Sequence, residues 1–234
     1  MVVFILHILN YLQNFAVIFL SMIAFFLPFI AVFAWRNREA MRGKRPHFNY
    51  FMERFFMSAE ANWLVFAWAL AEATVWFIIP EFLLMLLIFM KIHRKFDLVK
   101  YDILGTIAGT LLGLLWRLSD SGFLRLPYIR PRMLEQVDIW FQQHGLLGLL
   151  YQPFSGVPYK VFIHQADQYH FFILWFLIIA IFARMVRYLI IYEATKALYP
   201  LVHHFVRKHY AWLFVIAIAI FTFLLLHVVD VYGS

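Results

Sequence analysis

Residues 61–90 read ANWLVFAWALAEATVWFIIPEFLLMLLIFM, and this stretch decides how the chain folds. It is apolar except for Glu72 and Glu81 near its middle, and Pro80 directly precedes the second glutamate. A continuous helix of this length would be about 45 Å long, against a bilayer hydrocarbon core of about 30 Å. Two crossings would need about 40 residues. Because the stretch is too long for one crossing and too short for two, we expect a broken, re-entrant hairpin that lines a protected interior.

The composition is that of an integral membrane protein. Of 234 residues, 65% are hydrophobic and 14% are charged, and the mean hydropathy is +0.78. The absence of cysteine excludes disulfides, thiolate metal sites and iron–sulfur clusters. The net charge is +7, but most lysines and arginines fall in short segments between apolar runs. We therefore expect contact with anionic lipid headgroups and no nucleic-acid binding.

Six hydrophobic units follow one another along the chain, at residues 11–35, 61–90, 103–117, 145–165, 170–192 and 210–229. Pro153, Gly156 and Pro158 interrupt the unit 145–165, which predicts a second re-entrant hairpin. The first unit lacks the basic region and cleavage site of a signal peptide, so we expect a retained span. The predicted segments are an N-terminal transmembrane helix with a basic loop (1–58), a core with both hairpins (59–200) and a C-terminal transmembrane helix (201–234).

The distribution of basic residues predicts how the hairpins are oriented. The loops 36–60 and 91–102 are both strongly basic, which places both in the cytoplasm. They share one side only if 61–90 enters and leaves the membrane by the same face, and 145–165 then enters from the opposite face. We therefore predict an all-α, polytopic membrane protein with two opposed re-entrant hairpins in an inverted repeat, a common plan of secondary transporters.

Two pairs of charged residues are candidates for the functional chemistry. Glu72 and Glu81, in an apolar setting, are candidates for binding and releasing a proton; the alternative is a permanent pair with an arginine that only stabilises the fold. Arg184 and Arg187 are spaced to lie on one helix face and carry the planar donors that suit a phosphate. The alternative for the arginines is that they reach toward the cytoplasmic headgroups.

Lys160 belongs to the second hairpin, in the segment SGVPYK at residues 155–160. It is a third candidate for contact with an anion, and a simple interfacial position is the alternative. Gly105, Gly109 and Gly113 form a stripe of small residues, which predicts close helix packing and says nothing about the substrate.

The histidines do not indicate a metal site. His203, His204 and His209 lie beside basic residues and have no accompanying carboxylate, so we expect no bound metal. For Asp167, with His164 and His170 near it, we favour an exposed polar turn, with a titrating role as the alternative. No nucleophile motif, phosphate loop or dinucleotide fingerprint is present, and we expect neither an enzyme nor a cofactor.

Three segments resemble the DedA superfamily, also called the VTT or SNARE-associated domain, and within it the YqaA-like branch. They are EATVWFIIPE at residues 72–81, GVPYKVF at 156–162 and RMVRY at 184–188, and the resemblance covers about residues 60–200. Pro80 stands alone where the family usually has two or three prolines, Ala183 replaces a glycine, and Asp167 stands where a glycine is common. The chain therefore looks like a divergent member.

The resemblance implies a function in lipid transport. Members resemble flippases and scramblases, and bacterial ones are implicated in moving undecaprenyl phosphate or phospholipids between leaflets with the proton gradient. Carried over to this chain, Glu72 and Glu81 correspond to the proton-linked acids, and Arg184 and Arg187 to the arginines that meet the phosphate. The implied location is the bacterial inner membrane.

The sequence therefore predicts a translocase for a phosphate-bearing lipid, coupled to protons. Two alternatives remain: a structural or partner-binding membrane protein with buried salt bridges, and a proton-coupled carrier of a small solute or ion. Whether the chain forms a homo-oligomer is left open.

Overall fold

The fold is all-helical. The computed structural model describes residues 2–39, 48–75, 81–90, 95–116 and 118–233, and no β-strand occurs in these ranges. The prediction of an all-α chain is therefore confirmed for the described residues. The elements are α1 (Val2–Arg36), α2 (Phe48–Met57), α3 (Ala59–Thr74), α4 (Glu81–Met90), α5 (Lys95–Trp116), α6 (Asp120–Phe123), α7 (Pro131–His144), the 3-10 helix η1 (Gly145–Tyr151), α8 (Gln152–Ser155), α9 (Tyr159–Gln168) and α10 (Ile173–Gly233).

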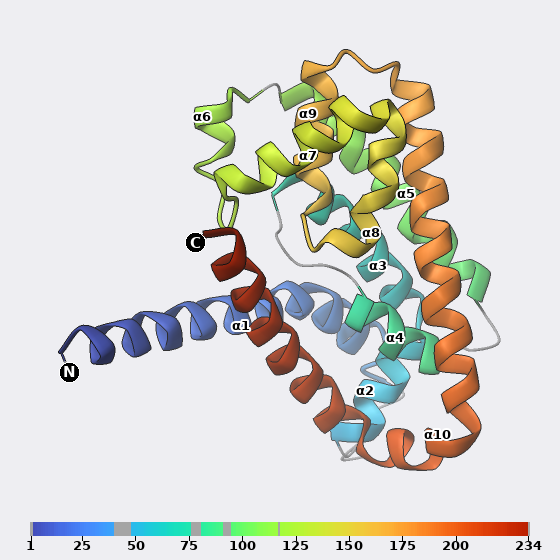
Figure 1. Ribbon diagram of the computed structural model, residues 1–234. Helices are drawn as coiled ribbons and strands as arrows, with labels where there is room; N and C mark the ends of the chain where they lie inside the picture. The colour runs from blue at the N-terminus through green and yellow to red at the C-terminus, as the bar shows by residue number, and fades with distance from the viewer. Residues whose placement is uncertain (1, 40–47, 76–80, 91–94, 117, 234) are drawn as a thin grey trace.

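Three helices are long and apolar enough to cross a bilayer, which makes the chain compatible with an integral membrane protein. The candidate spans are Leu9–Arg36, Phe96–Trp116 and Ile173–Tyr232. The last belongs to α10, which is bent at His209 into two arms that form a V in Figure 1. The descending arm lies beside α5, and the returning arm leads back toward the middle of the molecule (Figure 1).

Two boundaries predicted from hydropathy are wrong. The third unit was expected at 103–117 after a basic loop, whereas α5 already begins at Lys95 and continues through that loop. Units 170–192 and 210–229 were expected as separate spans, and they lie in the two arms of α10 on either side of the bend at His209; the segment between them was expected as a loop, whereas it is helical as far as the bend. The predicted boundary after residue 200 therefore falls inside a helix. Hydropathy reports where apolar residues stop, and a charged segment with good helix formers continues the helix beyond that point.

Both units expected to be broken consist of more than one element. In the stretch 61–90, α3 ends at Thr74 and α4 begins at Glu81; Pro80 lies outside the described residues. In the unit 145–165, η1 and α8 end at Gly156, whose φ of 71° is in the left-handed region that favours glycine. Pro158 then precedes the first residue of α9, where the missing amide hydrogen breaks no helical bond.

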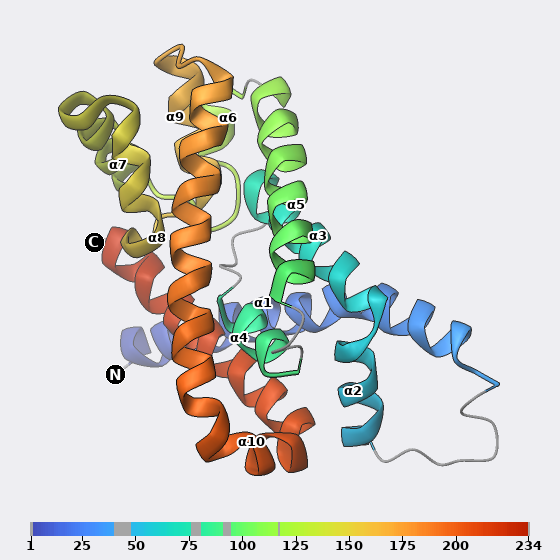
Figure 2. The same ribbon diagram turned by 90° about the vertical axis from the view of Figure 1, so that its right-hand side faces the viewer.

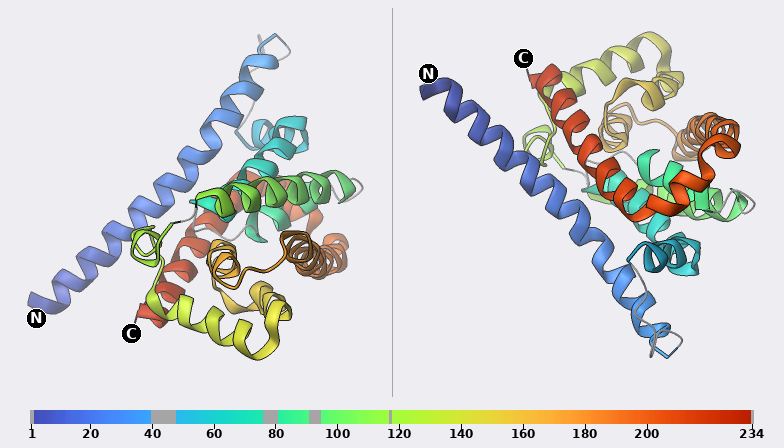
Figure 3. Two further views of the ribbon diagram at one scale, coloured as in Figure 1. Left: turned by 90° about the horizontal axis from the view of Figure 1, so that it is seen from above. Right: turned by 90° about the horizontal axis from the view of Figure 1, so that it is seen from below.

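The core has two apolar clusters. In the first, Phe26 of α1 contacts Trp68 of α3 and Phe214 of the returning arm, with ring centroids 5.7 and 4.9 Å apart. The second lies among α7, α9 and α10 around Phe141, Phe162 and Phe176. Helix α1 runs across the direction of α5 in Figures 1 and 2, and its N-terminal part extends beyond the other helices when viewed from above or below (Figure 3). The three candidate spans are therefore not a parallel bundle.

The glycine stripe of α5 lies against α3. A Cβ atom added to Gly105 would lie 2.3 Å from the carbonyl oxygen of Phe66, and one added to Gly109 would lie 2.6 Å from the Cβ of Ala73. Both distances are shorter than real carbon contacts, so only glycine allows the two backbones to come this close. At Gly113 the nearest atom is a methyl of Ile163 in α9, at 3.2 Å. The stripe therefore sets the distance between α3 and α5.

Replacing Gly109 with alanine is expected to destabilise the protein. The new methyl would force α3 and α5 apart, and overpacking of this kind costs about 1–3 kcal/mol. This exceeds the gain of about 1 kcal/mol that alanine has over glycine inside a helix. The thermal unfolding midpoint in detergent should fall for Gly109→Ala. Gly122→Ala is the control, because its methyl would meet no heavy atom closer than 3.4 Å. Equal midpoints for the two variants would contradict close packing at the stripe.

Candidate functional site

Charged side chains gather at the centre of the molecule, where α3, α5, α9 and α10 meet. Glu72 from α3 is 1% exposed and Asp102 from α5 is 5% exposed. The cations Lys160 from α9, and Arg184 and Arg187 from α10, are equally buried. We call these five residues the central cluster. Charges at this depth are costly unless they compensate one another, and the cluster holds both signs.

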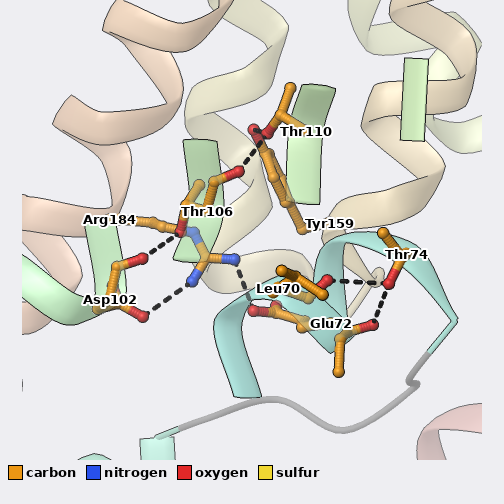
Figure 4. Close-up of polar contacts among 9 residues, drawn as sticks. Leu70, Glu72, Thr74, Asp102, Thr106, Thr110, Tyr159 and Arg184 are labelled. Carbon is orange, nitrogen blue, oxygen red and sulfur yellow. Dashed lines mark hydrogen bonds and ion pairs between the residues drawn. The ribbon is translucent and has the colours of Figure 1, made fainter. Parts of the chain in front are cut away.

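Arg184 links the two carboxylates of the central cluster (Figure 4). One terminal nitrogen donates to Glu72 Oε2 at 2.5 Å, and the other donates to Asp102 Oδ1 at 3.4 Å. The guanidinium carbon also lies 5.0 Å from the centre of the Tyr159 ring, so the cation faces an aromatic surface as well. Arg184 is therefore held by three elements, α3, α5 and α9.

A line of hydroxyl groups along α5 positions the aromatic ring. Thr106 donates to the backbone carbonyl of Asp102 at 2.8 Å, and Thr110 donates to that of Thr106 at 2.7 Å. The Thr110 hydroxyl also lies 3.0 Å from the Tyr159 hydroxyl, within hydrogen-bond distance (Figure 4). Both threonines are fully buried. The ring beside Arg184 is therefore oriented from α5.

Lys160 connects the two broken segments. Its amine donates to the carbonyl oxygen of Val75, directly after α3, at 3.0 Å. The lysine follows the turn at Gly156, where the Ser155 hydroxyl accepts a hydrogen bond from the Val157 amide at 3.1 Å. The end of α3 and the start of α9 thus meet at one side chain. A helix end needs partners for its free carbonyls, and a buried ammonium needs acceptors, so each supplies what the other lacks.

The cluster is not fully satisfied by its own members. Glu72 Oε1 and Arg184 Nε are buried without a hydrogen-bond partner in the part of the chain that the structure describes. The charge of Glu72 acts on all three cations of the central cluster. The site therefore has an acceptor atom and a donor atom that no described residue uses, which suits a group that exchanges a proton or accepts a hydrogen bond from Arg184.

The structure brings together four of the residues that the sequence singled out. Glu72, Lys160, Arg184 and Arg187 all belong to the central cluster. The backbone of Glu81 begins α4, and its side chain lies outside the described residues, as does the whole of Pro80. The predicted packing and hinge positions lie elsewhere in the structure. The glycine stripe belongs to α5 and packs against α3, and Gly156 and Pro158 lie in the turn before α9. Pro153 lies in the first turn of α8.

Asp102 is the central residue that sequence reasoning missed. It was assigned to a basic loop because charged residues surround it, yet it lies within α5. A usable signal was its spacing of four residues from Thr106, and of four more from Thr110, which places one polar face on a helix. Tyr159 was missed because an aromatic residue at an apolar position carries no such signal.

The histidine segments have no metal-site geometry. No group of three or more metal-ligating side chains occurs within the described ranges. The rings of His203 and His204 lie 4.2 Å apart, and His203 also stacks on Tyr199. His164 lies near the central cluster instead, and contacts Asp120 of α6.

Comparisons with protein-family models, curated proteins and solved structures gave no match for this chain.

Removing the Arg184 charge is expected to destabilise the fold strongly. Arg184→Gln leaves two buried carboxylates without their cation, and breaking a buried pair costs about 3–5 kcal/mol. The matched control is Arg36→Gln, because Arg36 pairs with Glu60 at 2.9 Å while its side chain is 63% exposed. An exposed pair is worth up to about 1 kcal/mol, so thermal unfolding in detergent should separate the two variants clearly.

The double variant Glu72→Gln/Arg184→Gln should be more stable than Arg184→Gln alone, because one uncompensated carboxylate has been removed. If the second substitution lowers the midpoint further, the two residues do not act as a pair.

Proposed function

We propose that this protein is a membrane carrier that moves a lipid with a phosphate headgroup between leaflets, coupled to protons. The observation that carries this proposal is the buried triad in which Arg184 contacts Glu72 and Asp102. An arginine that pairs with carboxylates is also a good ligand for phosphate, because both anions accept two parallel N–H donors.

The pair gives a physical route to coupling. Carboxylate and phosphate compete for the same guanidinium, so the headgroup gains access to Arg184 when Glu72 takes up a proton. When the headgroup leaves, Arg184 again favours the ionised carboxylate, and the proton is released. Lys160 and Arg187 add positive charge around the same point. Proton uptake and anion binding would thus occur together.

The two broken segments support a carrier more than an anchor. The carrier we propose has both as re-entrant hairpins from opposite faces, in an inverted repeat of the kind in which broken segments form the substrate site. The bond from Lys160 to Val75 joins the ends of the two segments beside the charged centre. The resemblance to the DedA superfamily and a place in a bacterial inner membrane are parts of the same proposal. Glu81, on the far side of the first break, is its second candidate proton carrier.

One observation favours a different function. Arg184 already contacts two carboxylates and a ring, which also fits a purely structural ion pair in a partner-binding membrane protein. The two functions differ in whether it matters which of the two positions carries the cation and which carries the anion. A structural pair needs opposite charges, whereas a carrier needs the cation at the position that meets the headgroup.

Lipid exchange in proteoliposomes tests the carrier. Labelled phospholipid or undecaprenyl phosphate should change leaflets, faster with a pH gradient. Arg184→Gln should slow this by about ten- to hundredfold, the worth of a charge-assisted hydrogen bond of about 1.5–3 kcal/mol. Glu72→Gln should abolish the effect of the gradient. Arg207→Gln is the matched control, since Arg207 pairs with Glu53 outside the cluster and is 56% exposed. Rates unchanged by the first two variants would reject the carrier.

The swapped variant Glu72→Arg/Arg184→Glu separates the carrier from the structural alternative. Both functions predict that stability recovers relative to either single variant. The carrier predicts that lipid exchange stays low, whereas a structural pair predicts full function. Uptake of a small solute, or an electrical current, without any lipid movement would instead indicate the small-solute carrier.

A further inference from the structure

A small polar cavity lies beside the central cluster, between the ends of α3, α5 and α9 and the segment around α6. Its lining includes Thr74, Trp116 and three polar residues of α9: Lys160, His164 and Asp167. The α9 residues are four and three positions apart, so they follow one another along one face of that helix. The cavity therefore runs from the buried amine of Lys160 toward the more exposed end of α9.

The size of this cavity fits water and excludes a lipid headgroup. The space open to the centre of a water-sized sphere is about 20 Å³. About 10–15 Å³ is enough for one water, provided that two to four polar groups bind it. The lining meets this condition with an amine, a hydroxyl, an imidazole and a carboxylate. The cavity is thus a site for an ordered water.

Lys160 needs such a water. An ammonium has three N–H donors, and in the described part of the chain Lys160 uses one of them, on the carbonyl of Val75. With Lys160 2% exposed, the other two have no access to bulk solvent. Thr74 donates its own proton to Leu70 at 2.9 Å, so its oxygen remains an acceptor for the same water. The inner end of the cavity therefore binds water from two sides.

The outer end of the cavity reaches solvent through an imidazole and a carboxylate. His164 Nε2 lies 2.8 Å from Asp120 Oδ1; the His164 side chain is 9% exposed and that of Asp120 is 61% exposed. Gln168 donates to the same Asp120 oxygen at 2.6 Å, and the His164 ring is stacked on Phe123 at 4.2 Å. These contacts tie α6 to α9 at the outer end. An exposed acid, an imidazole, the cavity and a buried amine then follow in order.

We propose that this cavity holds a water that links His164 to Lys160, and that protons reach the central cluster by this route from the face that carries α6. We call this route the inlet. It rests on the proton coupling of the proposed function and adds the side from which the proton comes. Lys160 is thereby assigned to proton access, in addition to the positive charge that it adds beside Arg184.

Each proton step along the inlet balances. The Lys160 ammonium gives a proton to Glu72, which is buried three residues before the Val75 carbonyl that binds Lys160, and takes one from the water. The water is restored by a proton from the protonated His164, which is recharged from the solvent beside Asp120. Among the residues that the structure describes, Asp120, Asp167 and Lys160 are the charged groups that face His164 in the cavity and at its mouth; the described lining residues of α3 and α5 are uncharged.

A single cysteine reports this route, because the native chain contains none. Thr74→Cys keeps the size of the side chain in the cavity, and its thiol loses the S–H stretching band in the infrared when it ionises, so no reagent has to enter the cavity. In vesicles whose inner and outer pH are set separately, the fraction of thiolate should rise with the pH on the α6 side and should not depend on the pH on the other side. Ser121→Cys, at an exposed position of α6, identifies that side with an impermeant reagent.

Thr106→Cys is the matched control. Thr106 is also buried and also donates to a carbonyl four residues earlier, but it does not line the cavity. Its thiolate fraction should not respond to the pH of either side, because Thr106 is fully buried and does not line the cavity. If Thr74→Cys does not fold, Ile163→Cys, which also lines the cavity, replaces it.

A Thr74→Cys thiolate fraction that follows the pH of the opposite side, or of neither side, would overturn the inlet. The test does not measure lipid movement. A positive result without lipid exchange would therefore leave the inlet in place and reject the carrier, and the reverse result would do the opposite.

Discussion

The contact between Arg184 and the two carboxylates Glu72 and Asp102 is the constraint on which the rest of the structure depends. Five charged side chains are buried where four helices meet, and burial of each one alone would be unfavourable by several kcal/mol. Arg184 is the member that contacts both acids, so its position requires α3 and α5 to lie close together. The glycine stripe allows that approach, and Tyr159 closes the third side of the guanidinium. Packing and charge are thus satisfied by one arrangement.

The two broken segments and the charged centre depend on each other. A helix that ends inside an apolar environment leaves carbonyl groups that need donors. Lys160 supplies one donor to the end of α3, and its own position follows from the turn at Gly156 and Pro158. Removing the break would displace the lysine, and removing the lysine would leave the break unsatisfied. The hinge residues and the charged residues therefore form one unit.

The sequence predicted the helical class, and it singled out four residues that the structure brings together in the central cluster, because charge within an apolar stretch is visible in one chain; the re-entrant hairpins stay a prediction. It did not predict Asp102, because the loop 91–102 was defined by its charges, whereas residues 95–102 belong to α5. The continuity of α10 through residues 193–208 was missed for the same reason. The sequence also could not predict which charged residues contact each other. Glu72 and Arg184 are 112 residues apart, and only the close packing of α3, α5 and α10 makes them neighbours.

The central cluster has a polar cavity on one side, and this difference between its sides favours transport over a purely structural ion pair. Replacing a buried pair with apolar side chains is often neutral or stabilising, so stability alone gives little reason to bury five ionisable groups. A structural pair also needs no water, yet a water-sized cavity extends from Lys160 toward His164 and the exposed Asp120. In the described part of the chain, the cluster has an unused donor on Arg184 at its centre, and a polar path lies on one side. A proton-linked anion site needs both, whereas a structural salt bridge needs neither.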